Sequence, residues 1–182
     1  MTKVAVLLAN GFEEIEALTQ VDVFRRAEIE CDMIGLTSQQ VVGSHDILVL
    51  ADKVFDGDLS AYDMIVLPGG LPGASNLRDH NGLIRELQAA AQSDKYVAAI
   101  CAAPIVLDRA GLLDGKNYTC FPDQEEEIKS GNHVEEIVVV DGNIITSRGA
   151  GTSLAFVYKL VDLLGGDGKA LSERMVYNEL FK

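Results

Sequence analysis

Short apolar runs alternate along the chain with segments whose apolar residues recur every three or four positions. Apolar runs of this kind are typical of strands buried on both faces, and the periodic segments are typical of amphipathic helices. The expected strands cover residues 4–9, 31–36, 64–67, 96–100, 118–121 and 144–147. The expected helices cover residues 13–26, 82–91, 102–110, 151–164 and 168–180. This alternation predicts an α/β fold with a mostly parallel sheet.

Two segments have a pattern that is typical of antiparallel pairing. One is residues 47–50, and the other is the pair 137–140 and 144–146, which Asp141-Gly142-Asn143 joins as a hairpin signal. The chain has no internal repeat, no low-complexity stretch and no linker long enough to separate domains. We therefore expect residues 1–182 to form a single domain.

The charge and the cysteines exclude several classes of partner. The net charge is −13, and no basic run or stripe appears, which argues against nucleic acid and anionic membranes. The first apolar stretch, residues 4–9, is too short for a signal sequence or a membrane span, so we expect a cytoplasmic location. Three cysteines without a paired CxxC spacing argue against a disulfide scaffold or a zinc ribbon.

Cys101 carries the clearest chemical signal in the sequence. It follows the apolar run 96–100 directly, and a helical pattern begins at once after it. A nucleophile at such a strand-to-helix turn projects out of the sheet, in the geometry of a nucleophile elbow. The small residues Ala99 and Ala103 allow the close backbone approach that this turn requires. The free N–H groups of a helix start would also favour a thiolate.

Two other loops follow predicted strands and are expected at the same edge of the sheet. Residues 10–16 hold three glutamates at the start of a helix, where acidic side chains are favoured by the helix dipole alone. Residues 67–74 form a glycine-rich turn without the Lys-Ser/Thr of a phosphate loop. Its backbone N–H groups could instead face a substrate oxygen, as in an oxyanion hole.

Four motifs, in order and at matching spacing, resemble one known family. They lie at residues 11–17, 66–70, 98–104 and 146–152. The sequence resembles the ThiJ/PfpI superfamily, in the branch of the Parkinson-disease-associated protein deglycase (often called DJ-one). The resemblance covers essentially the whole chain. It implies a flavodoxin-like three-layer sandwich, a homodimer with the first helix at or near the interface, and cysteine chemistry without a metal or other cofactor.

The resemblance also implies roles for particular residues. Cys101 would be the nucleophile, and Glu16 stands in the place of the carboxyl group that touches it. The turn of Gly69 and Gly70, together with the N–H of Ala102, would face the oxyanion. Further residues of the substrate pocket or the interface would be Arg26, His45, Phe121, Arg148 and Gly149.

The chain departs from some relatives in having no evident Cys-His dyad. Phe121-Pro122 stands where some relatives have a histidine before the proline, and the residue after the nucleophile is Ala102. A helix N-terminus lowers the pKa of a thiol from about 8.5 to only about 7. Since an ionised Glu16 would repel a thiolate, Glu16 can assist only as a protonated group that donates to sulfur.

This constellation suits addition of the thiol to an electrophilic carbonyl group. For this family, the implied activity is that of a glyoxalase III or protein deglycase, which acts on methylglyoxal, glyoxal and early glycation adducts without glutathione. The alternative is a non-catalytic oxidative-stress sensor or redox-regulated chaperone that responds through oxidation of Cys101. A peptidase or a thiamin-precursor enzyme is less well supported. Of the other cysteines, Cys31 is expected in the core, and Cys120 is a candidate resolving thiol.

Overall fold

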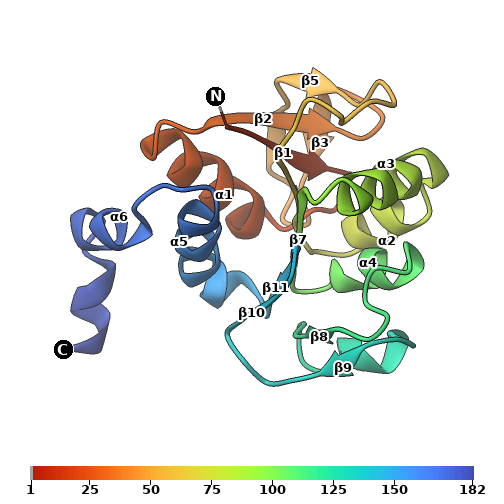
Figure 1. The fold of residues 1–182 in the computed structure, drawn as a ribbon. Helices are drawn as coiled ribbons and strands as arrows, with labels where there is room; N and C mark the ends of the chain where they lie inside the picture. Colours follow the sequence, from red (N-terminus) through yellow and green to blue (C-terminus); the bar gives the residue numbers. More distant parts are fainter. Residues whose placement is uncertain (1) are drawn as a thin grey trace.

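The computed structural model describes residues 2–182, and its centre is a seven-stranded sheet with the strand order β10-β11-β7-β6-β1-β2-β5 (Figure 1). All neighbouring strands pair in parallel except β10 and β11. The strands are β1 (Lys3–Leu8), β2 (Glu30–Gly35), β5 (Lys53–Val54), β6 (Met64–Leu67), β7 (Tyr96–Ile100), β10 (Val138–Asp141) and β11 (Ile144–Ser147).

Helices cover both faces of this sheet. The α-helices are α1 (Glu14–Arg26), α2 (Gly73–Arg78), α3 (Asn81–Gln92), α4 (Pro104–Arg109), α5 (Ser153–Leu163) and α6 (Gly168–Arg174). Helices α1, α5 and α6 pack on one face, and α2, α3 and α4 pack on the other (Figure 1). The result is the expected flavodoxin-like three-layer sandwich.

Alternate residues of the central strands build two separate cores. In β1, Ala5 and Leu7 belong to the core under α2, α3 and α4, whereas Val4, Val6 and Leu8 belong to the core under α1 and α5. All five are fully buried, as the unbroken apolar run predicts for a parallel strand with helices on both faces.

The expected antiparallel pairs are confirmed. Strand β4 (Leu48–Leu50) pairs with β3 (Gln40–Val42), and β10 pairs with β11 across the turn at Gly142. Strands β3 and β5 and helix α2 were not expected. Each has only two to six residues, which is too short for a clear hydrophobic period.

The strand expected at residues 118–121 is wrong. Only β8 (Asn117–Tyr118) forms there, and it pairs in parallel with β9 (Asn132–His133) in a separate two-stranded sheet. The Thr119 N–H donates to the side-chain oxygen of Thr146, and Pro122 has no N–H to donate. The backbone after Tyr118 therefore does not continue the strand-to-strand hydrogen bonds of β8.

The helix expected at residues 168–180 is also too long. Helix α6 ends at Arg174, and Val176 adopts a left-handed conformation with a φ of 62° before the 3₁₀ helix η3 (Tyr177–Phe181). The ring of Tyr177 packs on that of Tyr158 with 5.2 Å between centroids. This aromatic contact redirects the chain.

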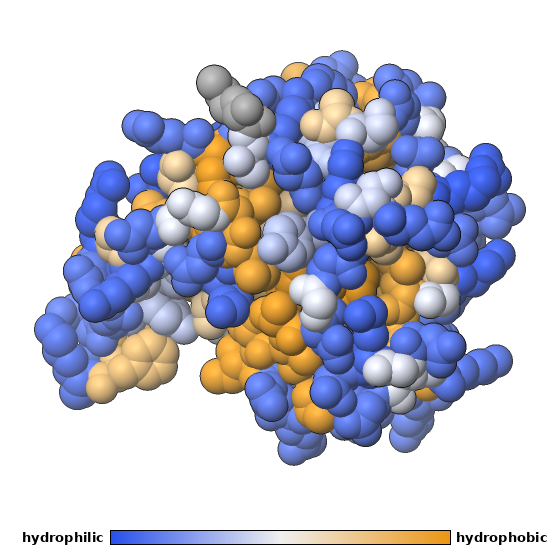
Figure 2. Space-filling view, in the orientation of Figure 1, coloured by the Kyte–Doolittle hydropathy of each residue, from blue (hydrophilic) through white to orange (hydrophobic). Residues whose placement is uncertain are grey.

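The surface agrees with the strongly acidic composition. Figure 2 shows a mostly hydrophilic face, with apolar side chains gathered over the region of β10 and β11. Within that region, Ile137 and Val140 are exposed by 59% and 38%. Among residues 2–182, no helix has both the length and the apolar character needed to cross a bilayer.

Candidate active site around Cys101

Cys101 lies at the carboxyl end of β7, in a sharp turn of three residues before α4 begins at Pro104. Its φ of 65° is in the left-handed region, which costs a residue other than glycine about 1–2 kcal/mol. The helix therefore starts later than the sequence pattern suggested, because Cys101, Ala102 and Ala103 form the turn. This strained turn is the expected nucleophile elbow.

Two backbone hydrogen bonds hold the elbow in this conformation. The Cys101 N–H donates to the carbonyl oxygen of Ser147 at 3.1 Å, and the Cys101 carbonyl oxygen accepts from the Phe121 N–H at 2.9 Å. The end of β11 thus holds the N–H of Cys101, and the loop after β8 holds its carbonyl oxygen. The thiol itself is only partly buried.

Glu16 is the carboxyl group that the structure brings to Cys101. It lies in the first turn of α1 and is fully buried. Its Oε2 accepts a 2.8 Å hydrogen bond from the Gly69 N–H, while Oε1 is buried and has no nitrogen or oxygen partner among residues 2–182. The carboxyl group lies close enough to the Cys101 thiol for each group to shift the pKa of the other.

The environment of Glu16 favours its protonated form. Burial is the main cause that raises its pKa from 4.5 to about 7, and the hydrogen bonds from Cys101 and Gly69 oppose this shift. A buried carboxylate oxygen without a hydrogen-bond donor is unfavourable, so the lack of a donor to Oε1 also favours the protonated form of Glu16. Glu16 can therefore hold or release a proton close to neutral pH.

The thiol of Cys101 has no lowered pKa. Burial raises its pKa above the ordinary value of 9.0, and the charge of an ionised Glu16 raises it further. The N–H groups of Ala102 and Gly70 face the sulfur and lower the pKa in part. Because the two groups interact, they lose their protons in two steps that belong to the pair, and the form that carries one proton is reached at about pH 7.

The glycine turn supplies two different functions. The Gly69 N–H is already used by Glu16, so this residue positions the carboxyl group. A Cβ on Gly69 would lie 2.7 Å from both the Cys101 Cβ and the Glu16 Oε2, so the close approach needs glycine here. Gly70 has a φ of 84°, and its N–H, with that of Ala102, faces the sulfur of Cys101.

The three glutamates of the first loop have separate partners. Glu13 caps α1 by accepting from the Glu16 N–H. Glu14 is buried and accepts from the N–H and Nδ1 of His45, and the Nδ1 contact measures 2.9 Å. Burial acts to raise the pKa of Glu14, but the hydrogen bonds from His45 outweigh it and lower the pKa to about 2. The sequence did not predict that Glu14 is buried and binds His45, because the helix dipole favours an acidic side chain equally at all three positions.

The remaining expected residues lie at different distances from the thiol. Phe121 is half-exposed beside Cys101, and a Cβ on Gly149 would lie 3.4 Å from its ring. Arg148 acts electrostatically on Cys120. His45 is 71% exposed and contacts the glutamates instead of the thiol. Arg26 binds Asp22 at the other end of α1, about 15 Å along the helix from Glu16, so it is not part of this chain's own pocket.

The other two thiols are buried. The burial of Cys31 and of Cys120 raises the pKa of each to about 12. Cys31 lies in the core, as expected. Cys120 belongs to the core under α2, α3 and α4, whereas Cys101 packs against the opposite core. A disulfide between Cys120 and Cys101 would therefore require one of the two side chains to leave its core.

Comparisons with known proteins agree with this geometry. Residues 2–163 match the DJ-1/PfpI family. The chain is 39% identical over 169 residues to protein dj-1beta of Drosophila melanogaster, with 90% of each protein covered. It is 41% identical over 172 residues to protein DJ-1 homolog B of Arabidopsis thaliana, covering 93% of this chain but only 39% of that relative. The chain thus spans about two fifths of the length of that plant protein.

Solved structures show the same fold. A DJ-1 superfamily protein from Salmonella typhimurium, solved as a mutant, superposes with a TM-score of 0.92 at 36% identity, over 97% of this chain and 98% of that one. An oxidized form of DJ-1 from Toxoplasma gondii gives a TM-score of 0.92 at 32% identity, with the same coverage.

Proposed function

The chain belongs to the DJ-1/PfpI family, and we propose that it is a glyoxalase III-type enzyme and deglycase. Its substrates would be methylglyoxal, glyoxal and early glycation adducts, without glutathione, a metal or another cofactor. The observation that supports this proposal is the pair of Glu16 and Cys101. A carboxyl group with a pKa of about 7 touches the thiol, and the N–H groups of Gly70 and Ala102 face the sulfur.

The first step joins the thiol to the aldehyde carbon of methylglyoxal. Glu16, as carboxylate, accepts the thiol proton while the sulfur of Cys101 attacks the carbon. The raised pKa of the thiol is compatible with this step, because the base acts during the attack and no free thiolate is needed beforehand. Glu16 then gives the proton to the new oxyanion, which yields a hemithioacetal.

The second step moves protons between the two carbons and between their oxygens. Glu16 removes the proton from the former aldehyde carbon, and the electron pair of that C–H bond forms the double bond of an enediolate. Glu16 then gives a proton to the neighbouring carbon, while the hydroxyl proton moves to the former ketone oxygen, which yields a lactoyl thioester on Cys101. Water then cleaves the thioester, releases lactate and restores the thiol. The sum is one methylglyoxal and one water converted to one lactic acid.

The test is turnover by the purified protein in heavy water. Lactate should form without glutathione and should carry deuterium on the carbon next to the carboxyl group, because Glu16 exchanges its proton with solvent. The Cys101→Ser variant should keep the same circular dichroism and lose this activity. Full activity in that variant would exclude the thiol mechanism.

A second candidate function is an oxidative-stress sensor or redox-regulated chaperone. It is favoured by the similar Toxoplasma gondii protein, which was solved in an oxidized form. Two added oxygens on Cys101 could accept from a protonated Glu16 and from the N–H groups that face the sulfur. A protein that forms this species but converts no methylglyoxal would be such a sensor.

We further propose a cytoplasmic homodimer that binds small dicarbonyl or glycated substrates and no nucleic acid or membrane. The apolar residues Ile15, Leu48 and Leu50 are each exposed by more than half, on α1 and on β4. They would be covered by the second chain, and Arg26 could then reach the partner. Light scattering of the purified protein measures the mass, and a monomer would contradict the dimer.

A further inference from the structure

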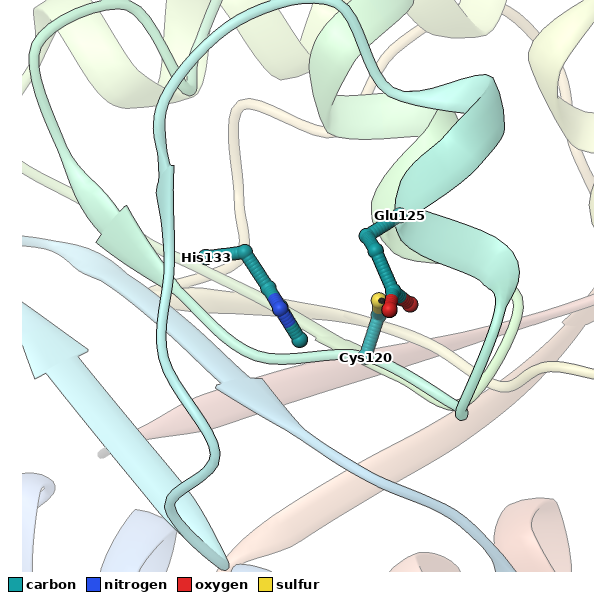
Figure 3. Close-up of side chains that lie close together, drawn as sticks. All are labelled: Cys120, Glu125 and His133. Atoms are coloured by element: carbon teal, nitrogen blue, oxygen red, sulfur yellow. Dashed lines mark hydrogen bonds between the residues drawn. The ribbon is translucent and has the colours of Figure 1, made fainter.

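A second cluster of reactive side chains lies in the part of the chain that follows β8. It consists of Cys120, Glu125 and His133, which come from the loop after β8, from the 3₁₀ helix η1 (Gln124–Glu127) and from β9 (Figure 3). One ligand atom from each lies within 4.8 Å of the others. We propose that these three side chains bind a divalent transition-metal ion of the zinc type.

The backbone brings the three residues together from positions that no common metal motif would link. Strands β8 and β9 pair in parallel, so that Tyr118 is opposite His133, and Cys120 follows two residues after Tyr118. The chain then turns at Asp123, whose φ is 69°, and the Gln124 N–H donates to the Phe121 carbonyl oxygen at 3.0 Å. This turn places Glu125 over the sulfur of Cys120 (Figure 3).

The distances are close to those of a tetrahedral site. The Cys120 Sγ and the Glu125 Oε2 are 3.8 Å apart. With metal bonds of about 2.3 Å to sulfur and about 2.1 Å to oxygen, tetrahedral ligands lie about 3.6 Å apart. These two atoms are thus nearly at the required spacing, and the ring nitrogen of His133 lies within 4.8 Å of both.

Within this cluster His133 lacks a hydrogen-bond partner, whereas Cys120 and Glu125 bond each other. The Nε2 of His133 is buried and has no hydrogen-bond partner among residues 2–182. Leaving such a group unpaired is unfavourable, and a metal contact would satisfy it. Cys120 is fully buried and its thiol donates a hydrogen bond to the Glu125 carboxylate, so a bound metal ion would take the place of the thiol proton between them.

The ligand chemistry selects the class of metal. A thiolate, an imidazole and a carboxylate together suit zinc and its neighbours, whereas calcium and magnesium prefer oxygen ligands only. A doubly charged ion would neutralise Cys120 and Glu125, so the nearby Arg148 would face no net positive charge. Three protein ligands would leave the fourth position for water.

The other His-and-carboxylate cluster serves as a comparison. Glu13, Glu14 and His45 also lie within ligand distance of one another, but His45 is mostly exposed and its Nδ1 already bonds Glu14 at 2.9 Å. His45 and Glu14 thus satisfy each other by a direct hydrogen bond, without a metal. It offers a matched histidine control for the proposed site.

The experiment uses cobalt(II) as the probe, because tetrahedral cobalt with a thiolate ligand has visible and near-ultraviolet absorption bands. The full chain carries the Cys101→Ser substitution, so that Cys101 cannot bind the metal. One cobalt per chain should produce these bands, and zinc should remove them by displacement. Both Cys120→Ser and His133→Gln should abolish them, and Glu125→Gln should weaken binding at least tenfold.

The controls are Glu126→Gln and His45→Gln, which should bind cobalt like the parent protein. Since Cys120→Ser changes a buried residue, circular dichroism checks its fold, and the half-buried His133→Gln gives an independent result. Zinc should also raise the melting temperature of the parent but not of His133→Gln. The proposal is overturned if one equivalent of cobalt gives no thiolate band, if the band survives in His133→Gln, or if His45→Gln removes it.

Discussion

The N–H of Gly69 donates a 2.8 Å hydrogen bond to the Oε2 of Glu16, joining residues 53 positions apart in the sequence. This bond fixes the carboxyl group of Glu16 beside the thiol. It also shows why the two glycines of the turn differ: the Gly69 N–H orients the Glu16 carboxyl group, and the Gly70 N–H faces the sulfur of Cys101.

Glu16→Gln should separate hydrogen bonding from proton transfer. The amide oxygen can still accept from Gly69, and the amide nitrogen can still donate to the sulfur, but the amide cannot carry a proton between carbons. We expect methylglyoxal turnover to fall by about a hundredfold or more, the usual contribution of a positioned acid or base. Steady-state kinetics on the purified variant measure this.

Glu13→Gln is the matched control, because glutamine can also accept from the Glu16 N–H at the helix cap. Its turnover should remain within a few-fold of the parent. An equal loss in both variants would show that Glu16 has no special role. Glu14 is unsuitable as a second control, because it is buried and holds His45.

The pH dependence of kcat/KM should follow the protonation of Glu16 and Cys101. The active form carries one proton on Glu16 and Cys101 together, and the inactive acid form carries two. Since the pKa of Glu16 is raised to about 7, kcat/KM should rise with pH and level off above about pH 7. Glu16→Gln should lose this inflection. A parent profile that stays flat between pH 5 and pH 8, without the rise, would contradict the assignment.

Mild peroxide should oxidise Cys101 before the other two thiols. The pKa of all three thiols is raised by burial, so exposure decides the order: Cys101 is partly exposed, whereas Cys31 and Cys120 are buried. Mass mapping of peptides should find two added oxygens on Cys101 first. This order should persist in Glu16→Gln, because a donor beside the sulfur remains. Preferential modification of Cys120 would refute the prediction.

Gly69→Ala should damage both stability and activity. The new methyl group would lie 2.7 Å from the Cβ of Cys101 and from the Oε2 of Glu16, and neither can move freely. We expect a loss of about 1–3 kcal/mol in the free energy of unfolding, as for other overpacked sites. Urea titration measures it, with Gly151→Ala as a control where a Cβ meets no neighbour. Similar stability of the two variants would contradict the close approach.

Glu14 should make the protein sensitive to acid. Its pKa is about 2 in the folded chain and 4.5 without these contacts, so its contribution to stability is complete above pH 4.5 and is lost as the pH falls towards 2. In this window, the free energy of unfolding should fall by roughly 1 kcal/mol per pH unit because of this group. Glu14→Gln should show a shallower slope in urea titrations, and an unchanged slope would exclude the assignment.

Sequence reasoning identified the thiol and its carboxyl partner because both lie in contiguous motifs. The apolar run 96–100 and the small residues around Cys101 already specify a strand followed by a tight turn. The chain order of the strands also predicted that the loops would meet at one edge of the sheet. Glu16 followed from the family resemblance, and its position in the first turn of α1 agrees with it.

Other features depend on contacts between distant segments, which no local pattern records. The sequence of the glycine turn does not show whether the N–H of Gly69 or that of Gly70 binds Glu16, because this depends on where α1 places the Glu16 side chain. Likewise, residues 118–121 have the composition of a strand, but the side chain of Thr146 takes the N–H that a neighbouring strand would need. The cluster of Cys120, Glu125 and His133 arises only when β8 and β9 pair.

The two backbone hydrogen bonds of Cys101 have a consequence for local opening of the protein. The amide protons of Cys101 and Phe121 are both engaged at the end of a central strand, between β11 and the loop after β8. In hydrogen–deuterium exchange such amides are released only when a large part of the fold opens. We therefore expect the Cys101 amide to exchange slowly, so that the thiol is held by a rigid segment instead of a mobile loop.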